Sequence, residues 1–66
     1  MPTTYEVIVG NVGTVYRGAN GFDARVEYNR AVGRSKRGGG RDAGEPVTLM
    51  RDDDIAAEYM PEGYEP

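Results

Sequence analysis

Two short segments with alternating apolar residues flank the dipeptide Gly10-Asn11, and this arrangement constrains the fold more than any other feature of the sequence. Alternation with a period of two is typical of a half-buried strand, and Gly takes positive φ at the first position of a tight turn without steric cost. A two-residue loop pairs Val9 with Val12, and a four-residue loop pairs Val9 with Thr14. Both registers place the same residues on one face: Tyr5, Val7 and Val9 from residues 4–9, and Val12, Thr14 and Tyr16 from residues 12–17.

One helix is predicted over about residues 21–36. Asn20 is suited to be its N-cap, and Asp23 three residues later makes a variant of the capping box. Phe22 and Val26 fall outside the main stripe, so either the helix buries a wide arc or Val26 is partly exposed. The run Gly38-Gly39-Gly40 ends the helix. The stripe that is suited to lie on a sheet consists of Ala24, Tyr28, Ala31 and Ser35, with Val32 beside it.

Residues 47–51 and 55–60 are predicted to form a second hairpin. A two-residue turn at Asp52-Asp53 would put Leu49 on the face of Ala56 and Glu58, whereas a three-residue loop over 52–54 puts it with Ile55, Ala57 and Tyr59. We favour the three-residue loop because it gathers the large apolar residues and because Asp tolerates the left-handed conformation. The sequence thus predicts an α+β fold of ββαββ order, with a four-stranded antiparallel sheet of two hairpins and one helix on one face. Residues 1–60 form the single domain, and 61–66 form a flexible C-terminal tail.

Composition limits both stability and chemistry. The 66 residues include neither Cys nor His, and chains of this size bury only about 60% of the surface exposed on unfolding. Without disulfides or zinc, the chain must pack tidily or use a partner subunit, so a homodimer is one expectation. No signal-peptide pattern and no long apolar run are visible, which predicts a cytoplasmic protein without membrane contact.

The residues that enzymes use are scarce. Catalysis needs a nucleophile or an acid–base pair with a tuned pKa, and the only Ser, Ser35, has no obvious base near it in the sequence. The consecutive Asp52, Asp53 and Asp54 lack the alternating ligands and the Gly of a calcium loop. We therefore expect no catalysis, no cofactor and no metal.

Charge is distributed unevenly along the chain. Residues 21–41 hold six basic and two acidic side chains, whereas residues 42–66 hold eight acidic and one basic side chain. The simplest interpretation is that the two regions attract each other within the fold, and the alternative is that each faces a separate partner. The candidate phosphate- or nucleic-acid-binding residues are Arg34, Lys36, Arg37 and Arg41, of which the first three also complement a helix C-terminus. The candidate protein-binding acidic residues are Asp52, Asp53, Asp54 and Glu58, which could equally protect a sheet edge from aggregation.

Several segments together resemble a group of small uncharacterised proteins that phages, prophages and plasmids encode. They are Val9 to Tyr16, Ser35-Lys36, Gly38 to Arg41, Ala43-Gly44-Glu45 and Val47-Thr48-Leu49. The resemblance covers residues 5–59 and implies a mobile-element origin and a ββαββ fold, but no activity. Pro46 and the triple Asp depart from the pattern of the group.

Three functions follow as hypotheses. The first is a non-enzymatic binding protein of a mobile element that acts on a host protein or complex, for example as an inhibitor of a host nuclease or defence complex, through its acidic surface. The acidic pI of about 4.7 favours a protein target over nucleic acid. The second is a nucleic-acid or phosphate binder that uses residues 34–41, and the third is a self-assembling structural accessory protein.

Overall fold

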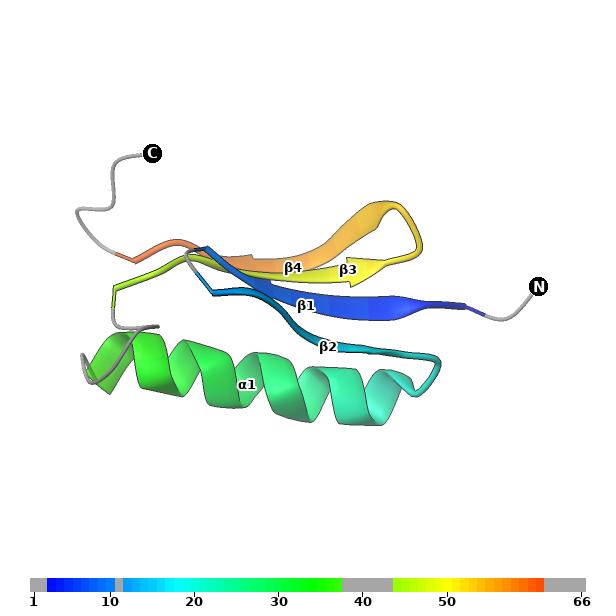
Figure 1. The fold of residues 1–66 in the computed structure, drawn as a ribbon, viewed down its shortest axis with the longest axis horizontal. Helices are drawn as coiled ribbons and strands as arrows, with labels where there is room; N and C mark the ends of the chain where they lie inside the picture. Colours follow the sequence, from blue (N-terminus) through cyan, green and yellow to red (C-terminus); the bar gives the residue numbers. More distant parts are fainter. Residues whose placement is uncertain (1–2, 11, 38–43, 62–66) are drawn as a thin grey trace.

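The computed structural model describes residues 3–10, 12–37 and 44–61. Its elements are β1 (Tyr5–Val9), β2 (Gly13–Gly18), α1 (Gly21–Arg37), β3 (Val47–Arg51) and β4 (Asp54–Tyr59). The strands form one sheet in the order β2-β1-β3-β4 with every neighbouring pair antiparallel, and α1 runs along one face of it (Figure 1). The α+β fold of ββαββ order is confirmed. Residues 38–43 and residues 62–66 of the predicted tail lie outside the described residues.

The core lies between α1 and the two central strands. Ala24 and Ala31 are fully buried, and their small side chains let the helix backbone approach the sheet closely. Phe22 is 76% exposed and Val26 is half-buried, so the helix buries a narrow arc and the second alternative for Val26 holds. The stripe predicted from the sequence is confirmed, because Ala24, Tyr28, Ala31 and Ser35 are the buried residues of α1. The sheet contributes Val7, Val9, Val47 and Leu49.

Side chains and backbone groups from neighbouring segments fix both ends of α1. The side-chain oxygen of Asn20 accepts hydrogen bonds from the backbone N–H groups of Phe22 (3.0 Å) and Asp23 (3.1 Å), which confirms Asn20 as the N-cap. At the other end, the backbone carbonyl of Ser35 accepts a hydrogen bond from Gly44 N–H at 3.1 Å. The buried Ser35 hydroxyl donates to the carbonyl of Glu45 at 2.8 Å. These bonds anchor the helix end to the segment that enters β3.

The first hairpin has a three-residue loop, so both of the loop lengths considered above are wrong. Val9 pairs with Gly13, and Val12 N–H donates to the Val9 carbonyl at 3.1 Å. Gly13, the first residue of β2, has φ +97°, a conformation that glycine adopts without steric cost. Gly10 is needed for space instead: a Cβ there would lie 2.9 Å from Cδ of Pro46.

A β-bulge at Val15 compensates for the odd loop length. Ile8 pairs with Thr14 and Val7 with Tyr16, which leaves Val15 as the extra residue. Val15 and Tyr16 therefore both pack against the core. Val12, by contrast, is 37% exposed in the turn, and Thr14 lies on the other face of the sheet, where its hydroxyl donates to Glu6 Oε2 at 2.9 Å. The prediction was wrong for these two residues.

The second hairpin shows the same compensation. Arg51 pairs with Asp54, so the turn has two residues, Asp52-Asp53, and the predicted three-residue loop is wrong. A bulge at Ala56 then shifts the register between Met50 and Leu49. Leu49 therefore faces Ala57, as predicted, while Ile55 pairs with Met50 and is 59% exposed. The bulge changes which alternate residues of β4 face the core, and the length of the turn alone cannot predict this change.

Gly33 lies in the interior of α1 without a steric reason for glycine. A Cβ added there would meet only the guanidinium Nη1 of Arg37, at 3.8 Å. We expect Gly33→Ala to raise the free energy of unfolding by about 0.5–1 kcal/mol, because Ala loses less backbone entropy in a helix. Urea unfolding monitored by circular dichroism measures the change. Gly10→Ala is the control and should destabilise the fold, since its Cβ would collide with Pro46; a loss of stability in Gly33→Ala would contradict the prediction.

Candidate functional site

The basic last turn of α1 and the aspartate turn lie at opposite ends of the molecule. Arg34, Lys36 and Arg37 belong to the last turn of α1, whereas Asp52 and Asp53 form the β3–β4 turn at the end where α1 begins (Figure 1). The aspartate turn is therefore too far from the helix C-terminus to neutralise it, and the simpler interpretation of the charge asymmetry is wrong for these residues. Arg41 lies outside the described residues.

The basic end of α1 has structural roles of its own. Lys36 Nζ lies 5.5 Å from the centroid of the Tyr59 ring on β4, a distance suited to a cation–π contact. Arg34 is half-buried, and Arg37 is exposed. Positive charge in the last turn also stabilises a helix through its dipole. Phosphate binding is therefore not required to explain why these residues are basic.

Asp52 supports the end of the sheet. Its Oδ1 accepts a hydrogen bond from Thr4 N–H at 3.0 Å, and its own N–H donates to the Thr4 carbonyl at 2.7 Å. These two bonds join the β3–β4 turn to the residue before β1. Asp52 also has φ +54°, a left-handed conformation that Asp tolerates better than most residues. Asp53 of the turn and Asp54 at the start of β4 are also exposed, and no described contact involves their carboxylates.

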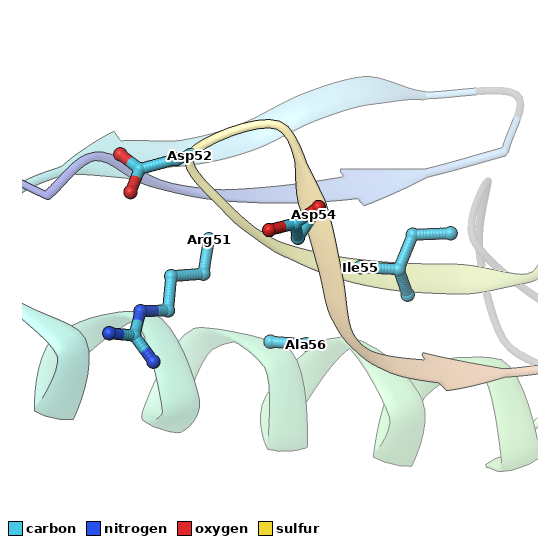
Figure 2. A pocket seen from close by; sticks show the side chains of 5 residues that line it. All are labelled: Arg51, Asp52, Asp54, Ile55 and Ala56. Atoms are coloured by element: carbon cyan, nitrogen blue, oxygen red, sulfur yellow. The ribbon is translucent and has the colours of Figure 1, made fainter.

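A shallow depression of about 550 Å³ lies beside this turn, lined by Arg51, Asp52, Asp54, Ile55 and Ala56 (Figure 2). All five residues are exposed, so solvent screens their charges. In Figure 2 the Arg51 side chain extends toward the helix side of the hairpin, away from Asp52. The depression is open and charged, unlike the mostly apolar and enclosed pockets that bind small molecules.

The face of the sheet opposite α1 is the largest feature that the sequence analysis missed. Ile8, Met50 and Ile55 form its apolar part: Ile55 pairs with Met50, and Ile8 lies diagonally across from Met50 on the adjacent strand. Ile8 and Met50 are half-buried, and Ile55 is 59% exposed. We call this surface the open face. By strand register it comprises Glu6, Ile8, Thr14, Arg17, Thr48, Met50, Ile55 and Glu58.

The structure places the residues that were considered above for catalysis and metal binding. The hydroxyl of Ser35 is buried and bonded to the carbonyl of Glu45, so it acts as a structural group. Across residues 3–10, 12–37 and 44–61, no three acidic side chains converge closely enough to hold a metal ion. No helix in these same ranges has the length and apolar character needed to cross a membrane.

Comparison with known proteins adds no relative: no protein-family model, curated protein or solved structure matches this chain. The resemblance to proteins of mobile elements stays a prediction. The surfaces described above are therefore interpreted from their own geometry and charge.

Asp52 and Asp53 can be separated by substitution. Asp52→Ala should lower the free energy of unfolding by about 1–2 kcal/mol, because it removes a hydrogen bond and puts Ala in a left-handed conformation. Asp53→Ala should change it by less than about 0.5 kcal/mol. Asp52→Asn should stay close to the wild type, since it keeps the acceptor and tolerates positive φ. Urea unfolding measures all three, and equal effects of the two Ala variants would contradict the role given to Asp52.

Tyr28 should make stability depend on alkaline pH. Burial raises the pKa of its hydroxyl above the usual value of 10.0; Arg25 lowers this pKa and Glu58 raises it to smaller extents. Above about pH 10 the unfolded chain loses this proton before the folded chain does, so the stability contributed by Tyr28 falls as pH rises. We expect Tyr28→Phe to lose less stability than the wild type between about pH 8 and about pH 11. Parallel losses in urea unfolding would show that Tyr28 does not carry the effect.

Proposed function

We propose that this chain is a non-enzymatic protein-binding domain, and that it docks through the open face and the neighbouring aspartate turn. The observation that carries the proposal is the exposure of Ile55, which is 59% exposed beside Met50 on a sheet face that α1 leaves uncovered. Apolar surface that is contiguous and exposed is typical of sites where proteins associate. Aromatic or aliphatic partner side chains would cover Ile8, Met50 and Ile55.

Charge at the edge of the open face indicates the kind of partner. Asp53 lies in the β3–β4 turn and Glu58 lies on the open face of the edge strand β4, while Asp54 begins β4 opposite Arg51, on the helix side; all three are exposed. Exposed rim charges raise association rates and reject partners of like charge more than they add affinity. The partner that fits this surface is a protein with an apolar centre and Lys or Arg residues around it.

The biological setting is the furthest extension of this proposal. The resemblance to phage, prophage and plasmid proteins supports a mobile-element origin, and a basic target suits a nucleic-acid-binding host protein such as a nuclease or a defence complex. In that case the chain acts as an inhibitor in the host cytoplasm. Its acidic residues would occupy the surface of the target protein that otherwise binds the phosphates of nucleic acid.

Affinity capture with matched variants tests the proposal. The tagged wild type should retain a defined basic protein from a lysate of the source organism, whereas Ile55→Ser and the triple variant Asp53→Lys, Asp54→Lys, Glu58→Lys should lose it. We expect each change to weaken binding about tenfold or more. Because these side chains are exposed, circular dichroism should show that the variants remain folded.

Controls of the same chemical type distinguish binding from general effects. Val12→Ser removes an apolar side chain from the β1–β2 turn, and Glu27→Lys reverses a charge on α1; both should capture the partner as the wild type does. Capture of the same proteins by every variant would refute the proposal. Binding to DNA or RNA at low salt that is lost on raising the salt concentration and on substituting Arg34, Lys36 and Arg37 would establish the nucleic-acid alternative instead.

A further inference from the structure

The side of α1 that faces away from the sheet carries a line of residues with the spacing of a helix-pairing seam. Phe22, Val26, Asn29 and Gly33 follow one another at intervals of four, three and four residues, the spacing at which two helices contact each other. With 3.6 residues per turn, this line lies about 160° around the helix from the buried stripe. Phe22 is 76% exposed there.

Two members of this line are unexplained by the chain's own fold. Phe22 is the only Phe of the sequence and the most exposed of the large apolar residues described, so it does not serve the core. Gly33 weakens the helix, and the nearest atom to a Cβ added there is 3.8 Å away in the flexible Arg37 side chain. A glycine in a helix allows the backbone of another element to approach closely. Both residues are explained if a second helix packs on this line.

The line is complementary to itself in the antiparallel direction. If the symmetry axis of a two-fold dimer passes between Glu27 and Tyr28, Phe22 lies opposite Gly33 of the other copy, and Val26 lies opposite Asn29. The largest side chain thus meets the position with no side chain, twice in each dimer. A two-fold interface requires this property, because residue i must contact residue j while j contacts i.

The flanking charges favour the same arrangement. In this register Asp23 of one copy lies beside Arg30 of the other, and symmetry makes two such pairs. Asp23 and Arg30 are both exposed. Among the described residues, Arg30 pairs with Glu27 of its own chain at 3.4 Å, an interaction of the kind that contributes little. In a parallel pair, each residue of this line would instead face the same residue of the other copy. The two Gly33 residues would then leave a gap, and the two Phe22 side chains would compete for one space.

We infer that α1 forms an antiparallel two-fold contact with α1 of a second copy of this chain, through Phe22, Val26, Asn29 and Gly33. Opposite-charge pairs between Asp23 and Arg30 set the register. The small area of a single helix pair makes the dimer weak and dependent on concentration. This contact lies on the opposite side of the molecule from the open face, so it is independent of the proposed function.

Sedimentation equilibrium of the full chain, from about 10 µM to about 1 mM, tests whether the dimer forms. We expect a reversible monomer–dimer equilibrium for the wild type. Phe22→Ser and Gly33→Leu should each raise the dimer dissociation constant about tenfold or more. Gly33→Leu is the sharper variant, because Leu favours the helix and should stabilise the monomer while filling the space that the other Phe22 occupies. Val12→Ser is the control and should dimerise as the wild type does.

Cross-linking tests the direction and the register of the helix pair. Because the chain has no native Cys, only the introduced Cys residues can form a disulfide. Under mild oxidation, an equimolar mixture of Asp23→Cys and Arg30→Cys should form a disulfide-linked dimer faster than either variant alone. In the antiparallel register two copies of residue 23 lie about 13 Å apart along the helix axis, which no disulfide can span.

Three outcomes would overturn the inference. They are a wild type that remains monomeric throughout, a dimer that Phe22→Ser and Gly33→Leu leave unchanged, and cross-linking of either variant alone as fast as that of the mixture. The second outcome would mean that the dimer forms through another surface. Ile55→Ser would then test whether that surface is the open face.

Discussion

The close contact between α1 and the two central strands is the interaction on which the rest of this structure depends. Ala24 and Ala31 are fully buried against a sheet whose Val7, Val9 and Val47 are also fully buried. The described residues form one helix, so this contact creates one core on one side of the sheet, and no described element covers the opposite side. Ile8, Met50 and Ile55 of the open face remain accessible because of that one-sided arrangement.

The fold could be predicted from the sequence because hydrophobic periodicity and helix-capping chemistry are local. Asn20, the Ala24-to-Ser35 stripe and the order of the elements all follow from spacing within a few residues. The details of both hairpins could not be predicted in this way. With the observed turn lengths and simple alternation, Tyr16 of β2 and Ala57 of β4 would face away from the core. A bulge in each of these edge strands returns them to the core side. Burial of the apolar side chains thus decides the register, and the backbone adjusts to it.

The candidate surfaces were less predictable than the fold, since they depend on what remains uncovered after packing. The sequence indicated the acidic residues but could not show that Asp52 bonds to Thr4, which precedes β1. Ile8 and Met50 sit at the outward positions of central strands, where alternation predicts polar residues. Phe22 and Val26 were visible as residues outside the helix stripe, and the spacing that they share with Asn29 and Gly33 was the available signal for a second contact surface.

The two proposed contacts use opposite layers of the molecule, and this has a consequence for binding. A dimer formed through α1 directs both open faces outward, away from the two-fold axis. Two identical faces on one particle allow the second binding event to become intramolecular when a target presents two copies of its site. A domain with a thin core and a modest apolar patch can then bind an oligomeric or repetitive target more tightly than a single open face could. The uncovered sheet and Gly33 both lower the stability of the monomer. Each also provides a contact surface, the open face for a target and the outer side of α1 for a second copy.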